Sequence, residues 1–464
     1  MAARQHFLML LFVTAVALPG TTVADWKDDI GWTQLKAEIG ASLEDGTGVN
    51  VAQIEASTGT NYMPDPSFFE FASPDKTFID GTGANTSYSG HARSVGQAFY
   101  GNQTSITPGI NNITNYDADD WIGNVIGFNT GADPESQNFK VQNHSYIGNG
   151  LSVDDATDIL QRVDFVVNQN DVSIFVGTNN SGSTPQLLVP AYNTISVGRT
   201  DGGHATGLTS FYGAGRVKPE IVTPGSAFTS YTTPRAASAA ALLHQKGAGT
   251  DSVRNESIKA ILLAGATKQE FGSWDRTTTR PLDEVFGAGE LNIRNSYYIQ
   301  DAGQFEGSTS EPVSAVGLKG WDYEASFDDS NSLYYNFDVG ASAAQIEASF
   351  LMTWNIDVID SNPLATEFDA STTLANFDME FYDSSGSFLG TLLDSSLSTG
   401  DNIEHIYLSD LSAGTYTLRI TGDTDHDFAF AWRINPVPEP SAALAMVLIG
   451  IGIGLTRRKA PSIV

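Results

Sequence analysis

The sequence predicts an α/β domain, with helices on both faces of a parallel β-sheet, followed by an antiparallel β-sandwich. From residue 25 to about residue 300, short apolar segments alternate with helical patterns, as in chains whose parallel strands are joined by crossover helices. After Asp301 the helical patterns stop. From there to about residue 434, strand-like segments are separated by Gly, Asp and Ser turns, which is typical of two packed antiparallel sheets.

Individual segments support this division. Val49 to Ile54 and Val172 to Val176 are short apolar runs, as expected for buried parallel strands, and a helical apolar pattern surrounds Ala260. The strands expected in the sandwich span residues 333–339, 348–356, 378–382, 405–408 and 415–420. We therefore expect one domain over residues 25–300 and a second over residues 301–434.

The composition restricts the partners of the protein. The 464-residue chain has 24 basic and 54 acidic residues, a net charge of −30, and no cysteine. An acidic balance of this size argues against nucleic acid and anionic lipid as partners and favours a soluble surface in a salty or calcium-containing medium. The lack of cysteine excludes a disulfide framework, a thiolate nucleophile and a thiolate metal site.

The beginning of the chain carries a targeting pattern. Arg4 precedes an apolar run from Phe7 to Leu18, and Thr22-Val23-Ala24 ends in a small-residue cleavage pattern. Residues 1–24 are therefore predicted to be a secretory signal peptide, and the mature chain to be exported.

The end of the chain, residues 435–464, carries a second pattern. Pro438-Glu439-Pro440 precedes an apolar run from Ala442 to Leu455, which a basic cluster at residues 457–459 closes. The basic cluster would keep this end in the cytoplasm, which predicts a transmembrane helix in transient contact with the inner membrane. The order of these parts resembles the PEP-CTERM sorting signal of Gram-negative bacteria. The resemblance implies an exosortase-type processing enzyme as a partner, and a product released or attached at the cell surface or extracellular matrix; an ordinary anchor helix is the alternative.

A candidate nucleophile lies in the segment from Thr229 to Leu243. Ser230 stands four residues before Pro234, which we expect to open an Ala-rich helix. Backbone N–H groups at the start of a helix lack partners, so an alkoxide or oxyanion is favoured there. Capping of a buried helix is the alternative role for this serine.

Three other polar residues lie at element boundaries earlier in the chain. Glu55 follows a buried strand, His91 opens a short helix, and Asn180 comes soon after another buried strand. Singly, they would be a solvated carboxylate, a capping histidine and a turn asparagine. Together with Ser230 they are the parts of an acyl-transfer site. The histidine would take the serine proton, the carboxylate would fix the histidine tautomer, and the asparagine would donate to the oxyanion.

These segments resemble the motifs of the subtilases, the subtilisin-like serine proteases. The segment around Ser230 is similar to their nucleophile motif, with Thr229 and Pro234 in register. The segments around His91 and Asn180 are similar to their histidine and oxyanion motifs. Further similar segments follow in the family's order at residues 189–198, 218–225 and 286–292. The resemblance covers about residues 45–300. It implies a subtilisin-like fold and an enzyme that hydrolyses protein or peptide substrates, with no required cofactor and no catalytic metal.

The same resemblance implies a substrate-binding strand with Ser145, Tyr146 and Gly148 as its binding residues. Ile147 stands in this strand where the family has glycine, and would narrow or block the cleft. Other departures are Glu55 in place of aspartate, Phe228 and Asn179 in place of glycines, and Arg93 in place of a small residue. Asn179 is therefore an alternative to Asn180 as the amide donor. Because only about twenty residues separate the signal peptide from Asp45, we also expect no folding pro-domain.

These departures leave two alternatives to an active serine endopeptidase. The first is a pseudoprotease that serves as an extracellular structural or binding protein. The second is a sedolisin-like site, in which carboxylates alone relay protons and the pH optimum is acidic; the presence of His91 argues against it.

The second domain carries a resemblance of its own. Residues 374–383, 401–406 and 411–416 are similar to the β-sandwich at the C-terminus of many secreted peptidases, which implies a jelly-roll-like accessory module. Its acidic turns are either ligands for structural calcium or solvated turn residues.

Overall fold

The computed structural model describes residues 25–57, 59–72, 76–312, 314–340, 346–362 and 367–436. The predicted signal peptide and all but the first two residues of the predicted sorting tail lie outside the described residues. Within the described ranges, no helix has the length and apolar character needed to cross a bilayer.

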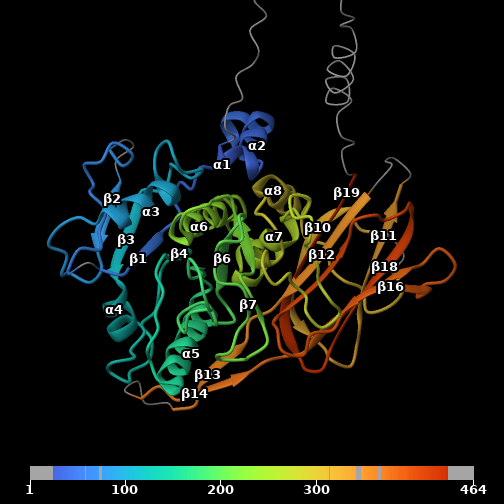
Figure 1. Ribbon diagram of the computed structural model, residues 1–464. Helices are drawn as coiled ribbons and strands as arrows, with labels where there is room; N and C mark the ends of the chain where they lie inside the picture. The colour runs from blue at the N-terminus through green and yellow to red at the C-terminus, as the bar shows by residue number, and fades with distance from the viewer. Residues whose placement is uncertain are drawn as a thin grey trace, which may run out of the picture.

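The first part of the chain forms a seven-stranded parallel sheet with the strand order β2-β3-β1-β4-β5-β6-β9 (Figure 1). Its strands are β1 (Val51–Glu55), β2 (Thr77–Asp80), β3 (Asn112–Asp117), β4 (Val141–His144), β5 (Ser173–Gly177), β6 (Ile195–Arg199) and β9 (Ile221–Thr223). A small antiparallel pair, β7 (Gly207–Leu208) and β8 (Val217–Lys218), comes between β6 and β9 in the sequence.

Helices cover both faces of this sheet. They are α1 (Trp26–Asp29), α2 (Trp32–Ile39), α3 (Gly90–Tyr100), α4 (Ala118–Asp120), α5 (Val153–Asn170), α6 (Thr229–Lys246), α7 (Asn255–Gly265) and α8 (Ile293–Asp301), with short turns of other helix types at Gly40–Ser42, Trp121–Val125 and Asp251–Val253. Successive side chains of a strand point to opposite faces, so Phe175 packs with the alanines of α6 while Ile174 and Val176 pack with α5. Each strand therefore needs apolar residues on both sides, as the continuous apolar runs of the sequence predict.

Helix α6 crosses the centre of the domain because its side chains are small. The alanines from Ala236 to Ala241 are fully buried. The helix begins at Thr229, so Pro234 lies inside it and not at its opening, which corrects the sequence-based expectation. Because proline has no N–H, it leaves the carbonyl of Ser230, one turn earlier, free for another donor.

The second part of the chain forms two four-stranded antiparallel sheets packed face to face (Figure 1). One contains β10 (Lys319–Phe327), β19 (His426–Pro436), β12 (Ile346–Thr353) and β17 (Ile403–Leu408); the other contains β11 (Leu333–Val339), β18 (Gly414–Gly422), β15 (Phe377–Asp383) and β16 (Thr391–Ser396). Alternate residues of β11 are buried in the core between the sheets. The predicted fold class, a helix-covered parallel sheet followed by an antiparallel sandwich, is confirmed.

The sandwich is packed tightly against the α/β part. Every residue of α7 is buried, and this helix packs against β12 and β19. Leu351 of β12 and Ala431 of β19 belong to the same apolar cluster as Leu262 of α7. A hairpin of β13 (Asp357–Asp360) and β14 (Ala370–Thr373) leaves the sandwich and runs under α5 (Figure 1). The two parts therefore share an apolar cluster at their junction, beside the core between the two sheets of the sandwich.

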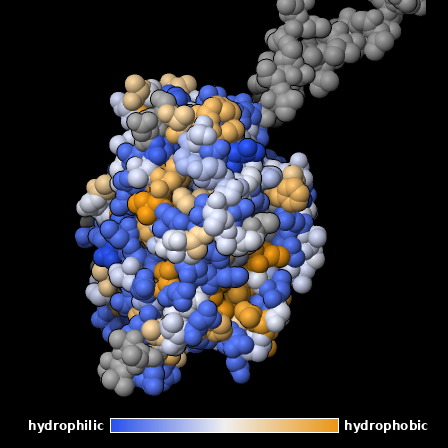
Figure 2. All heavy atoms as spheres, turned by 90° about the vertical axis from the view of Figure 1, so that its left-hand side faces the viewer, coloured by the Kyte–Doolittle hydropathy of each residue, from blue (hydrophilic) through white to orange (hydrophobic). Residues whose placement is uncertain are grey.

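The face that carries the β2 edge of the sheet is mostly hydrophilic (Figure 2). Its apolar residues form separate small groups between hydrophilic areas. Scattered exposed apolar groups of this kind are ordinary on protein surfaces.

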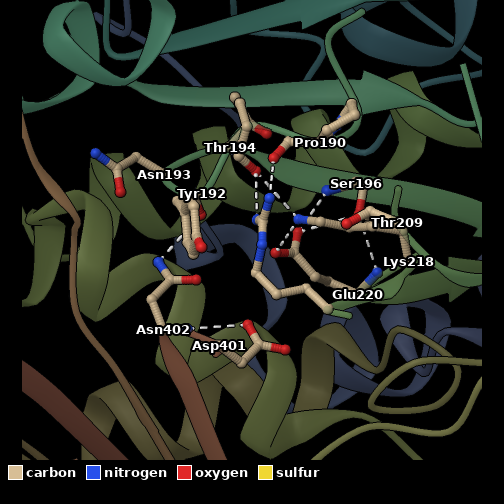
Figure 3. A network of polar contacts seen from close by, with 12 residues as sticks. Pro190, Tyr192, Asn193, Thr194, Ser196, Thr209, Lys218, Glu220, Asp401 and Asn402 are labelled. Atoms are coloured by element: carbon tan, nitrogen blue, oxygen red, sulfur yellow. Dashed lines mark hydrogen bonds and ion pairs between the residues drawn. The ribbon is translucent and has the colours of Figure 1, made fainter. Parts of the chain in front are cut away.

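A network of buried charges lies where the parallel sheet, α7 and the sandwich meet (Figure 3). Glu220 Oε1 accepts hydrogen bonds from Lys218 Nζ at 2.6 Å and from Lys259 Nζ at 2.9 Å, and each of the three side chains is 1% exposed. Lys259 also donates to the carbonyl of Tyr192. From the sandwich, Asn402 Nδ2 donates to that same carbonyl at 3.1 Å. The network thus connects the two parts through polar contacts as well as through the shared apolar cluster.

Candidate active site

Three of the predicted site residues come from the carboxyl ends of adjacent parallel strands. Glu55 is the last residue of β1, Ser145 follows β4 directly, and Asn180 comes shortly after β5. Strand β4 lies between β1 and β5 in the sheet. The carboxyl ends of parallel strands meet at one edge, so the topology brings these segments together where α/β sheets usually form their sites.

The N-terminus of α3 places His91 against Glu55. Ser89 caps the helix by accepting a hydrogen bond from Ala92 N at 3.2 Å, which fixes the first turn. His91 Nδ1 lies 2.5 Å from Glu55 Oε2. The Glu55 side chain is 1% exposed and the His91 side chain is 42% exposed. The longer side chain of glutamate therefore does reach the histidine from the end of β1.

Glu55 changes the acidity of His91. The hydrogen bond to Glu55 raises the pKa of His91 above its ordinary 6.5, and the negative charge of Glu55 acts in the same direction, while burial opposes both. A carboxylate on Nδ1 also favours the tautomer in which Nε2 is free to accept a proton.

Two residues that the sequence analysis missed hold the other side of Glu55. Gln53 Nε2 donates to Glu55 Oε1 at 2.7 Å and to the carbonyl of Ala92 at 2.9 Å. Tyr100 OH donates to Gln53 Oε1 at 2.5 Å. Both residues are fully buried. The available signal was a polar residue inside a buried strand, two positions before Glu55 and therefore on the same face of the sheet.

Ser230 faces Ser145 in this structure. Its Oγ donates to the carbonyl of Ser145 at 3.2 Å, and Ser145 Oγ donates back to the carbonyl of Ser230 at 3.3 Å. The second bond uses the carbonyl that Pro234 leaves free in α6. In the described part of the chain, no hydrogen bond joins Ser230 to His91. In this structure the Ser230 hydroxyl is therefore bonded to the Ser145 carbonyl and not to His91.

Asn180 is held by the first residue of α6. Its Oδ1 accepts from Thr229 N at 2.8 Å and from Thr229 Oγ1 at 3.2 Å. With the amide oxygen engaged, the Nδ2 donors remain for another acceptor. The N–H of Ser230 lies in the first turn of α6, where backbone donors lack helical partners. Asn180, Thr229 and Ser230 line a small cavity of about 60 Å³, together with residues 145–147 and 177–178.

A second, larger cavity lies beside the first. It has a volume of about 350 Å³ and a mostly apolar lining that includes Ile122, Phe128, Leu151, Ile159 and Leu187. Of the predicted substrate-binding residues, Tyr146 lines both cavities, Gly148 lines the larger one and Ser145 lines the smaller one.

Of the residues that depart from the subtilase pattern, Ile147 lies at both cavities. It is 41% exposed, and the expectation that it narrows the cleft stays a prediction. Phe228 is 50% exposed and packs edge to face on Tyr231, whose ring lies 6.5 Å from that of His91. The guanidinium of Arg93 lies over the ring of Phe68.

One group of carboxylates in the described residues is close enough to share a metal ion. Asp328, Asp329 and Asp425, all exposed, each place one oxygen within 4.8 Å of the others. Asp425 already accepts a hydrogen bond from Asp329 N at 3.0 Å. Exposed acidic turns often have this arrangement without an ion, so structural calcium stays a prediction.

Comparisons with known proteins found similar solved structures but no matching sequence. No family model and no curated protein matches the chain. Among solved structures, it is similar to a cold-adapted subtilisin-like serine proteinase, with 18% identity over 54% of this chain and 88% of that chain and a TM-score of 0.37. The structural neighbours are subtilisin-like serine proteases.

Two further neighbours have the same character. Fervidolysin from Fervidobacterium pennivorans, a keratinolytic enzyme related to subtilisin, shares 14% identity over 82% of this chain and 60% of that chain, with a TM-score of 0.38. MycP1, a serine protease of the type VII secretion system, shares 14% identity over 60% of this chain and 90% of that chain, with a TM-score of 0.39. Likeness at this level transfers no activity, so the proposals below rest on the geometry of the site.

Proposed function

We propose that this chain is an exported serine endopeptidase that hydrolyses peptide bonds through an acyl-enzyme on Ser230. The observation that carries the proposal is the contact of 2.5 Å between Glu55, the last residue of β1, and His91. Ser230 lies close by, because its hydroxyl bonds the carbonyl of Ser145, which follows the neighbouring strand β4. A buried carboxylate on one nitrogen of a half-exposed histidine is the arrangement that prepares a general base.

In the proposed reaction, the Ser230 side chain first leaves the Ser145 carbonyl and turns to His91 by a change of rotamer. His91 Nε2 takes the proton of Ser230 Oγ as the oxygen attacks the substrate carbonyl, and the oxyanion that forms accepts hydrogen bonds from Asn180 Nδ2 and from the N–H of Ser230. His91 then gives its proton to the leaving amine, which leaves an ester on Ser230. A water molecule, deprotonated by His91, attacks the ester and releases the acid product and the free serine.

The larger cavity defines the proposed substrate class. Its apolar lining suits a large apolar side chain of a peptide that lies along Tyr146 to Gly148. We also propose export by the predicted signal peptide, transient inner-membrane anchoring through the C-terminal helix, and processing by an exosortase-type enzyme, with the product at the surface or in the matrix of a Gram-negative cell. No cofactor is required in this scheme.

A second candidate is a pseudoprotease that binds ligands or matrix on the same fold. The observation that favours it is the bond of Ser230 Oγ to the carbonyl of Ser145, which keeps the hydroxyl off His91.

Peptide hydrolysis by the purified mature protein separates the two candidates. We expect cleavage of a peptide library after incubation with the wild type, and none above background with Ser230→Ala or His91→Ala. Ser226→Ala, which alters an exposed serine before α6, should cleave peptides like the wild type. It controls for losses caused by the purification of a variant and not by the removal of Ser230. If a folded wild type cleaves no more peptide than Ser230→Ala does, the result would favour the pseudoprotease.

A further inference from the structure

The outer wall of the larger cavity is a surface loop. The loop at residues 126–132 follows the helical turn Trp121–Val125 and carries Phe128 and Asn129, both of which line the cavity. It folds back on that turn, with Phe128 N donating to Ile122 O at 3.2 Å and Asn129 N to Gly123 O at 2.9 Å. The shape of the cavity therefore depends on where this loop is held.

Arg162 of α5 holds both ends of the loop. Its Nη1 donates to the carbonyl of Ile126 at 3.0 Å and to the carbonyl of Ala132 at 2.6 Å. Its Nε donates to Asp158 Oδ1 at 2.9 Å. The arginine is only 2% exposed, so these bonds are shielded from competing water.

The β13–β14 hairpin of the sandwich provides that shielding. The ring of Phe368, just before β14, lies 4.5 Å from the Arg162 guanidinium and packs edge to face on Phe165 with centroids 5.1 Å apart. The backbone N of Phe368 donates to Gly131 O at 2.8 Å, which is a direct bond to the loop. A cation over a desolvated ring face is attracted to it, so the phenylalanine both covers and orients the arginine.

The base of the hairpin is fixed as well. Asn168 Nδ2 of α5 donates to the carbonyl of Ile356 at 2.8 Å, and Ile356 N donates to Asn193 Oδ1 at 2.8 Å. Figure 1 shows the orange hairpin passing from the sandwich beneath α5. A continuous set of contacts thus runs from the sandwich, through Phe368 and Arg162, to the cavity wall.

We propose that the sandwich sets substrate selection through this hairpin, with Phe368 and Arg162 as positioning residues for the wall of the apolar cavity. The inference rests on the proposed peptidase function and adds a role for the sandwich in it. Arg162 bonds the loop at both of its ends, so loss of the Phe368 cover exposes these bonds to water, loosens the wall and weakens binding of the apolar substrate side chain. Ser230, in the first turn of α6, and its base His91, in the first turn of α3, are not part of these contacts.

The test uses the full mature chain and two peptides that differ only in Leu or Ala at the position where profiling of the wild type shows a preference for a large apolar residue. The wild type should prefer Leu by about tenfold or more in kcat/KM. Phe368→Ala should remove most of this preference, mainly by raising KM for the Leu peptide. The rate at which a fluorophosphonate labels Ser230 should stay unchanged. Ile359→Ala, an apolar truncation on the same hairpin at a 63% exposed position, is the matched control and should keep the preference.

The other outcomes overturn either this inference or the proposed function. No apolar preference in the wild type, an equal loss for both peptides in Phe368→Ala, or an unchanged preference overturns the inference. A folded wild type whose Ser230 is not labelled overturns the proposed function itself. If Phe368→Ala does not fold, Phe368→Leu keeps apolar bulk on Phe165 and removes the ring from Arg162; an unchanged preference in that variant also overturns the inference.

Discussion

Glu55→Gln is expected to lower kcat/KM by about 10⁴, the loss seen when a histidine-orienting carboxylate is replaced by its amide. Two donors point at the carboxylate: Gln53 Nε2 at 2.7 Å and His91 Nδ1 at 2.5 Å. An amide offers one acceptor oxygen and one donor group, so it cannot satisfy both. Its NH₂ group would either face another donor in a buried site or favour the histidine tautomer with its proton on Nε2. That tautomer cannot take the proton of Ser230.

The same variant should shift the pH dependence of the reaction. The general base must be neutral, so kcat/KM of the wild type should rise with pH through the pKa of His91, which Glu55 raises above 6.5. Removal of the hydrogen bond and the charge leaves only burial, which lowers the pKa, so the residual activity of Glu55→Gln should rise at a lower pH. A sedolisin-like relay would instead give the wild type an acidic optimum.

The measurement is the pH profile of kcat/KM for both proteins. Glu70→Gln is the matched control, because Glu70 is also buried and accepts from the backbone N–H groups of Gln103 and Thr104. A loss of less than tenfold in Glu55→Gln, or an unchanged acidic limb, would contradict the assigned role of the carboxylate.

Glu220→Gln should lower the free energy of unfolding by about 3–5 kcal/mol, the typical cost of removing one partner from a buried ion pair. Burial by itself would raise the pKa of Glu220, but the charges of Lys218 and Lys259 outweigh it and hold the pKa below its ordinary value. The amide leaves these two ammonium groups buried without the carboxylate that now bonds both of them. Its NH₂ group would also meet the backbone N–H of Ser196, which now donates to Glu220 Oε2 at 2.7 Å.

Urea unfolding of both proteins measures this effect. Asp301→Asn is the control, because the pair of Asp301 and Lys246 at 2.7 Å has a carboxylate that is 55% exposed, and such pairs are worth roughly 0–1 kcal/mol. Because the network and the apolar cluster span both parts of the chain, we expect a single unfolding transition. A cost for Glu220→Gln as small as that of the control would show that the network is not held together by its charges.

Local patterns were sufficient for much of the fold. The strand expected at residues 333–339 has the bounds of β11, because alternating burial against one core leaves a period of two in the sequence. Strand β12 is buried on both faces, and its alternation is therefore absent. Its packing on α7 was not predicted, because contacts between segments far apart in sequence leave no local pattern. The β13–β14 hairpin was missed because its two strands are short and mostly exposed, so they carry little apolar alternation.

The candidate site was predictable in its parts but not in its detail. The positions of Glu55, His91 and Asn180 at element ends could be read from the sequence, because strand and helix boundaries are local features. The orientation of Ser230 towards Ser145 depends on a rotamer and on the carbonyl that Pro234 leaves free. The support of Glu55 by Gln53 and Tyr100 depends on a contact between β1 and the end of α3. Both arise only when the elements are packed.

The central claim is that Ser230 becomes a nucleophile when His91 removes its proton. Labelling of the purified mature protein with a fluorophosphonate probe, with the modified residue located by mass spectrometry, tests it most directly. We predict one phosphonylated residue, Ser230, with labelling lost in Ser230→Ala and strongly slowed in His91→Ala. A folded wild type that takes up no more probe than Ser230→Ala would contradict the claim and leave a binding protein on a protease-like fold.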